Sequence, residues 1–129
     1  MTLLKECIDA LGDNIIVLSK KETEEIFECM AKSFPITSWG QIDWSAMKHT
    51  KKISSVDELA QHLNNKESSV YILWDEASLP SIKTNLNKVL AVIDDVTAVS
   101  FDTWVYAPTE GYVIEFYHEN EINIGWVNT

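Results

Sequence analysis

Apolar and polar positions alternate most regularly in the last third of the chain, from Val96 to Val127. This alternation predicts three antiparallel strands that end in a hairpin. Neighbouring side chains on a strand point to opposite faces, so the length of the hairpin turn decides which residues share a face. A two-residue turn at Glu119-Asn120 would bury a carboxylate whichever face is the core. A three-residue turn, His118 to Asn120, instead gathers the apolar residues Tyr112, Ile114, Phe116, Ile122, Ile124 and Trp126 on one face. The sequence therefore predicts the three-residue turn, with Asn120 in the left-handed conformation that asparagine tolerates.

The other face of this predicted sheet would carry acids and aromatic side chains. In the first of the three strands, Val99 and Phe101 are expected in the core, and this turns Asp102 and Trp104 outward. The outward-facing residues are then Asp102, Trp104, Glu115, Tyr117, Glu121 and Asn123. A surface of carboxylates with two large aromatic side chains and no cation suggests binding more than catalysis.

Helical spacing of the apolar residues predicts four helices in the rest of the chain. They run from Thr2 to Leu11, from Ser19 to about Phe34, from Ser55 to about Leu63 and from Ser78 to Ile93. Ser19 and Ser55 each begin a capping box, because a glutamate follows three residues later. The β-branched and aromatic run Ser69–Trp74 predicts a strand, and Ile15 to Leu18 predicts a strand or a buried extended segment.

The segment from Ile36 to Lys52 has the least regular pattern. Its cluster Lys48-His49-Thr50-Lys51-Lys52 is interpreted as a solvated loop, with a contact to an acidic group on a partner as the alternative. Cys7 and Cys29 fall on predicted buried helix faces and are expected to be reduced thiols. The predicted fold class is α+β: an antiparallel sheet with a C-terminal three-stranded meander and helices packed on one face. Residues 1–129 are expected to form a single domain.

The charged residues of the chain limit the classes of partner that fit it. The formal net charge is −10, the pI is about 4.6, and all ten cations are lysines. Arginine is the usual residue for bidentate contacts to phosphate and guanine, so a nucleic-acid partner is not expected. No lysine follows Lys88, whereas seven acids do. No apolar run reaches the roughly 18 residues of a membrane span, and the N-terminus has no signal-peptide pattern, so we expect a cytoplasmic protein with no membrane partner.

Motifs for catalysis or cofactor binding are missing from the sequence. The three histidines, His49, His62 and His118, have no metal-ligand spacing, and no glycine-rich phosphate loop or nucleophile elbow is present. No cofactor or metal is therefore expected. Asp102 with Glu115 is the best candidate for an acid–base pair, as in a hydrolase. Carboxylates on an open sheet face stay solvated, so the sequence favours a protein that is not an enzyme.

Part of the chain, from residue 70 to residue 127, resembles small bacterial immunity proteins of contact-dependent growth inhibition and polymorphic toxin systems. The resemblance lies in Leu73-Trp74-Asp75, Leu79-Pro80, the stretch from Asp94 to Trp104 and the stretch from Tyr112 to Trp126. It implies a cytoplasmic, non-enzymatic inhibitor that binds a cognate toxin domain, often a basic nuclease, and blocks its active site.

The charge pattern leads to a similar hypothesis, because carboxylates can pair with the cations of a nuclease cleft and aromatic side chains can anchor the interface. The expected partner-binding residues are Asp102, Trp104, Glu115, Tyr117, Glu119, Glu121 and Asn123. Three alternatives remain. The face is merely solvated, it is covered by the segment from Ile36 to Lys52, or it is covered by a second copy in a general interaction module. The sequence leaves the oligomeric state open.

Overall fold

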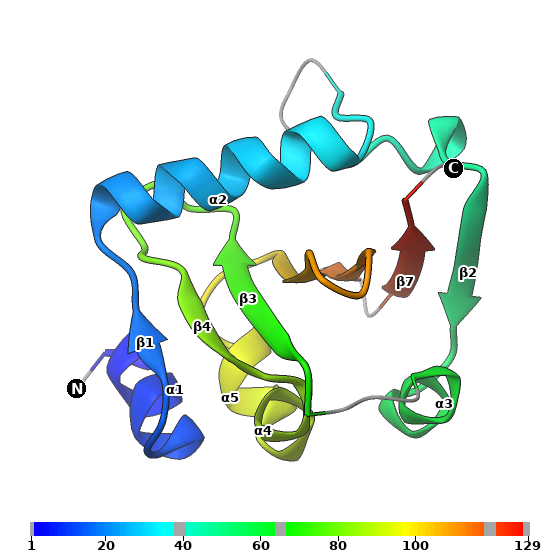
Figure 1. The fold of residues 1–129 in the computed structure, drawn as a ribbon. Coiled ribbons are helices and arrows are strands. Elements are labelled where there is room, and N and C mark those ends of the chain that lie inside the picture. The colour runs from blue at the N-terminus through cyan, green and yellow to red at the C-terminus, as the bar shows by residue number, and fades with distance from the viewer. Residues whose placement is uncertain (1, 38–40, 64–66, 118–120, 128–129) are drawn as a thin grey trace.

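A computed structural model describes residues 2–37, 41–63, 67–117 and 121–127 of the chain. In this part of the chain, seven strands form one antiparallel sheet (Figure 1). In spatial order they are β1 (Ile16–Val17), β4 (Ile82–Asn85), β3 (Ser69–Trp74), β5 (Thr103–Ala107), β6 (Tyr112–Tyr117), β7 (Glu121–Trp126) and β2 (His49–Ile53). The last three strands in sequence, β5, β6 and β7, are neighbours and form the predicted meander. The α+β class is therefore confirmed.

Helices cover both faces of the sheet, and each face has its own hydrophobic core. On one face lie α1 (Leu3–Leu11), α3 (Val56–His62), α4 (Leu86–Ala91) and α5 (Ile93–Thr97), as Figure 1 shows. Their apolar side chains, among them Leu59 and Val89, pack against Ile72 and Ile114 of the sheet and form what we call the first core. The longest helix, α2 (Lys20–Ser33), lies across the other face. We predicted that the helices would pack on one face of the sheet and leave the other face open. The position of α2 on that other face therefore changes the site.

The register of the hairpin follows the prediction. Tyr117 pairs with Glu121, so three residues separate the strands; these residues, His118 to Asn120, lie outside the described part of the chain. The six apolar residues predicted to share a face all belong to the first core or pack against it. Side-chain alternation alone was enough to choose between the two turns, because only the three-residue turn gathers the six apolar side chains on one face.

The first strand of the meander begins later than we predicted. Residues Ile93 to Thr97 form α5, and β5 starts at Thr103. The indole N–H of Trp74 donates to the carbonyl of Val96 at 3.0 Å, and this bond holds the short helix against the end of β3. The prediction of Phe101 in the core is wrong, because its side chain is 77% exposed in the turn before β5.

Two further strands replace elements that we predicted differently. Ile82 lies in β4, and the helix that follows starts only at Leu86, with the Asn85 side chain accepting from the N–H of Lys88. The predicted helix start at Ser78 is therefore wrong. The lysine cluster is not a loop, because His49–Ile53 is the edge strand β2, paired with β7. Its lysine side chains are exposed, and charges on an edge strand discourage pairing with other chains.

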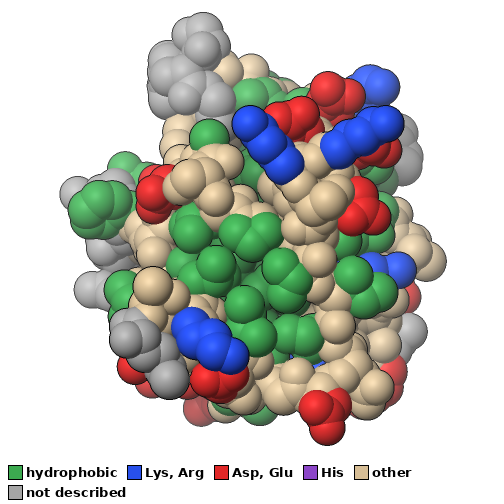
Figure 2. Space-filling model, turned by 90° about the vertical axis from the view of Figure 1, so that its left-hand side faces the viewer, with side chains coloured by type: hydrophobic (Ala, Val, Ile, Leu, Met, Phe, Trp, Pro, Cys, Tyr) green, Lys and Arg blue, Asp and Glu red, His purple; other side chains and the backbone are tan. Residues whose placement is uncertain are grey.

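The opposite edge of the sheet is apolar. The predicted strand is confirmed as β1, and the alternative of a buried segment is wrong, because Ile16 and Val17 are 55% and 45% exposed. Figure 2 shows this side of the molecule, where hydrophobic side chains gather in a broad patch. The prediction of a buried thiol is confirmed for Cys7 and wrong for Cys29, which is exposed; the Cys29 thiol lies 3.3 Å from the Tyr106 hydroxyl.

Candidate functional site

The sheet face that we expected to be open is covered. Met30 of α2 and Phe34 just after it, together with Ile42 and Met47 of the segment that follows, pack on this face in a second core. As a result, Asp102, Trp104 and Glu115 are only 5%, 3% and 4% exposed. The prediction that these three side chains form an outer surface is wrong, although Trp104 and Glu115 do lie on the predicted face of the sheet. The Glu115 carboxylate does not face water because the indoles of Trp44 and Trp104 lie against it.

Glu115 is buried with both carboxylate oxygens in use. The indole N–H of Trp44 donates to one oxygen and the indole N–H of Trp104 donates to the other, both at 3.0 Å. Burial raises the pKa of Glu115, the two indole donors partly offset this, and the nearby Asp102 raises it further. Since both oxygens already accept from indoles, Glu115 holds two tryptophans in place. We predicted that this carboxylate would be solvated, and that prediction is wrong.

Close packing of Trp44 explains the glycine at position 125. A Cβ atom there would lie 2.9 Å from the Trp44 ring and would also meet the end of Met47. Real Cβ atoms do not approach ring carbons this closely, so only glycine leaves room for the two side chains over β7. The segment from Gln41 to Met47 is thus fixed to the sheet by packing at Gly125 and by the bond to Glu115.

The other predicted partner-binding residues lie apart from Asp102, Trp104 and Glu115. Tyr117, Glu121 and Asn123 are half-buried, and Glu119 lies outside the described part of the chain. Tyr117 and Glu121 line a hollow of about 480 Å³ that Phe101 also borders; we call this the Tyr117 hollow. Glu121 contacts Lys52 of β2 at 3.4 Å, so this end of the face does carry a cation.

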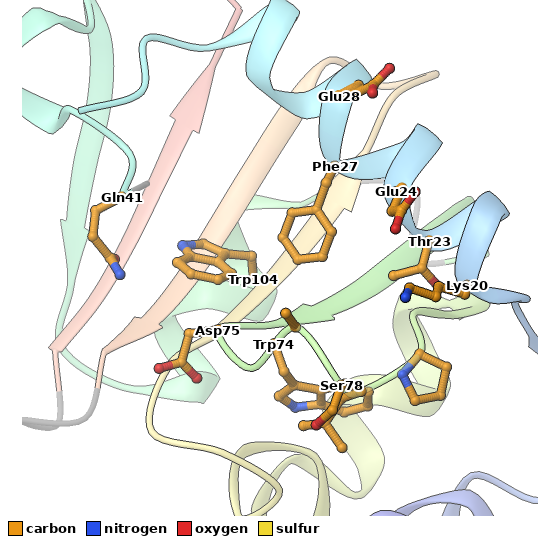
Figure 3. Close-up of a pocket in the computed structure, with 13 residues that line it drawn as sticks. Lys20, Thr23, Glu24, Phe27, Glu28, Gln41, Trp74, Asp75, Ser78 and Trp104 are labelled. Carbon is orange, nitrogen blue, oxygen red and sulfur yellow. The ribbon is translucent and has the colours of Figure 1, made fainter. Parts of the chain in front are cut away.

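A larger hollow lies between α2 and the end of β3. It has a volume of about 1150 Å³, and its walls include α2, the loop after β3 and Gln41 (Figure 3). We call it the α2 groove. Its aromatic side chains are Phe27, Trp74 and Trp104, and its carboxylates are Glu24, Glu28 and Asp75. Among the described residues that line it, Lys20 is the one cation.

Local sequence places each wall of the α2 groove. Ser19 caps α2 and Glu22 completes the capping box, which fixes where the helix begins. Glu24, Phe27 and Glu28 then follow at helical spacing and share one side of the helix. Thr23 ties the helix to the start of β4, since its hydroxyl accepts from the N–H of Ser81 at 3.0 Å.

The opposite wall is held by hydrogen bonds around Asp75. One oxygen of this carboxylate accepts from the Ser100 hydroxyl at 2.6 Å and from the N–H of Asp102 at 3.2 Å. Trp104 lies between the walls, where Glu115 holds its indole. The α2 groove is therefore a fixed cavity with an aromatic floor and acids on two walls.

Comparison with models of known protein families gives a match over nearly the whole chain. Residues 1–125 match the family model described as CdiI immunity protein, EcoliA0-like. The chain belongs to the CdiI immunity protein family. No curated protein matches it. Membership implies an immunity protein that neutralises a cognate toxin, and proteins of this kind are in general not enzymes. The match also covers the first 65 residues, where the sequence had shown us no resemblance.

Sequence reasoning missed most residues of the α2 groove in this immunity protein. A usable signal existed on α2, where Glu24, Phe27 and Glu28 combine two acids and an aromatic ring at helical spacing. Nothing local predicts that this side of α2 meets Trp104, which lies 77 positions beyond Phe27 in the sequence.

No helix in the described ranges is long and apolar enough to cross a membrane.

Proposed function

We propose that this immunity protein neutralises a toxin domain with a basic surface, a nuclease in the first instance, by binding it in the cytoplasm at the α2 groove. The observation that carries the proposal is the groove itself, where Glu24, Glu28 and Asp75 surround an aromatic floor. Nuclease clefts are rich in lysine and arginine because they bind phosphates. An acidic protein that occupies such a cleft pairs with those cations and keeps the substrate out.

Two features of the chain support this proposal. The net charge of −10 favours a positively charged partner and speeds its encounter. The aromatic residues supply the large, rigid contacts that dominate many interfaces. Tyr117 and Glu121 remain proposed contacts at the Tyr117 hollow, as a second surface that the same experiment compares with the groove.

The test first identifies the reading frame immediately upstream of this chain and, where it encodes a large secreted protein, uses the C-terminal domain of that protein. Binding is measured by calorimetry for wild type and for Glu24→Lys, Glu28→Lys and Glu25→Lys. Glu25 is exposed on the same helix and does not line the groove, so its variant has the same charge change at a matched place. We expect each groove variant to weaken binding at least about tenfold, which corresponds to about 1.4 kcal/mol, and Glu25→Lys to change it much less.

Circular dichroism first confirms that the three variants keep the helical content of wild type. Equal effects of Glu28→Lys and Glu25→Lys would show that the groove is not the contact surface. Glu121→Lys and Tyr117→Ala then test the Tyr117 hollow in the same assay. A wild-type chain that does not bind this domain would overturn the proposed function itself.

A further inference from the structure

We propose that the α2 groove receives one long cationic side chain, an arginine or a lysine, from the toxin domain. This inference rests on the proposed function and names the chemistry of the partner at the same site. It follows from how the aromatic rings, the acids and the single lysine are arranged around the groove.

The floor of the groove suits an apolar stem. Phe27 is half-buried, and Figure 3 shows its ring pointing from α2 toward the space beside Trp104. Arginine and lysine bury their alkyl stems against apolar surface while the charged head stays polar. The faces of aromatic rings also attract cations, and arginine stacks on them. A long cationic side chain therefore fits the floor better than a short polar one does.

The walls of the groove suit a positive head group. Glu28 comes from α2 and Asp75 from the opposite wall, so the groove is acidic on both sides. An apolar occupant would take these acids out of water without a partner, and an anionic occupant would be repelled. The acids thus select for a cation among the side chains that could fill the cavity.

The position of Lys20 makes one end of the groove less favourable for a cation than the other. It lies beside Thr23, at the other end of the groove from Asp75 and Gln41 (Figure 3). Eight residues of helix separate Lys20 from Glu28, which is about 12 Å along the axis at 1.5 Å per residue. An incoming cation is repelled near Lys20 and attracted near Glu28. We therefore place its head away from Lys20, with the stem over Phe27.

The groove is formed before any partner arrives. Trp104 is held by Glu115, and Asp75 is held by Ser100 and the backbone of Asp102. These contacts are made within the chain itself, so they do not depend on an occupant. A preformed pocket spares the partner the cost of ordering these side chains, and this favours a single well-defined anchor.

A first experiment needs no toxin. The indole N–H signals of the protein are followed by NMR during titration with N-acetyl-arginine amide, and with N-acetyl-citrulline amide as the neutral analogue of similar shape. We expect the Trp104 signal to shift with the arginine probe, to shift far less with citrulline, and to lose this response in Glu28→Gln. The same Trp104 shift with both probes would overturn the inference, and so would no shift with either.

The second experiment uses the toxin domain in double-mutant cycles. Each arginine and lysine on its binding surface is replaced by methionine, which keeps an apolar stem, and each variant is combined with Glu28→Gln, Phe27→Leu or the control Glu25→Gln. We expect one cationic residue to account for a loss of at least about tenfold and to couple to Glu28 and Phe27 but not to Glu25.

Coupling spread evenly over many cationic residues would contradict a single anchor. If the toxin binds wild type, Glu28→Gln and Phe27→Leu equally well, the inference falls while toxin neutralisation stands. If the toxin does not bind wild type, the proposed function fails first. The two failures are therefore distinguishable.

Discussion

At the scale of single residues, Glu115 makes stability depend on pH. Burial, the largest cause, raises its pKa above the ordinary 4.5, although the indole donors of Trp104 and Trp44 lower it in part. When the folded pKa lies above the unfolded one, the folded chain binds the proton more tightly. The contribution of Glu115 to stability is then complete below about pH 4.5 and is lost as the pH rises through the raised value.

We expect Glu115→Gln to remove this dependence. The difference in unfolding free energy, wild type minus variant, should fall as the pH rises from about 4 and should level off above the raised pKa. Urea unfolding at a series of pH values measures it, and the other carboxylates largely cancel in the difference. The amide also places an N–H₂ group against one of two indole donors, so one of the Trp44 and Trp104 signals should move in NMR spectra. A difference that rises with pH would contradict this account.

At the scale of elements, the start of α2 is fixed by its cap. The Ser19 hydroxyl accepts from the N–H of Glu22 at 3.1 Å, and the Glu22 carboxylate accepts from the N–H of Ser19 at 3.0 Å. We expect Ser19→Ala to lower the free energy of unfolding by about 1 kcal/mol, because one helix donor loses its partner.

Ser78→Ala is the matched control for this cap. The sequence suggests a helix start at Ser78 too, but its hydroxyl donates to Glu76 in an exposed turn, so we expect a change within about 0.5 kcal/mol. Urea unfolding of both variants compares the helix cap at Ser19 with Ser78, where the sequence predicts a cap but the structure has none. Equal losses would mean that the Ser19 contacts contribute nothing specific.

The elements show what the sequence pattern can and cannot predict. The hairpin was predictable because only one of its two registers gathers the apolar side chains on one face. Ile82, by contrast, fits a helix and a strand equally well, since Ile82 and Leu86 are four positions apart and share a face in both structures. The pattern could not reveal β2 either, because four of its five side chains are exposed and leave no apolar alternation.

At the scale of the whole molecule, the candidate site was hidden for a different reason. Alternation assigned Trp104 and Glu115 correctly to the face opposite the first core, but it cannot say what covers that face. The cover comes from α2 and from Trp44, which lies 71 positions before Glu115. The acids and aromatics that we expected to bind a partner are therefore partly structural, and Trp104 is the residue shared by the predicted surface and the α2 groove.

Net charge acts on the molecule as a whole and sets the last prediction. A charge of −10 would draw the proposed basic toxin domain toward the chain over distances comparable to the screening length, about 8 Å at physiological salt. We expect the association rate constant, measured by stopped flow, to fall steeply as salt increases. The dissociation rate constant should change little, because the contacts inside the groove are shielded from salt.

Matched variants separate steering from contact. Glu25→Gln and Glu28→Gln remove the same charge from α2, so both should weaken the salt dependence of association by a similar amount. Only Glu28→Gln removes a carboxylate that lines the groove, so only this variant should speed dissociation, by about tenfold or more. An association rate that does not change between about 20 mM and about 500 mM salt would show that the charge of the chain serves solubility and not recognition.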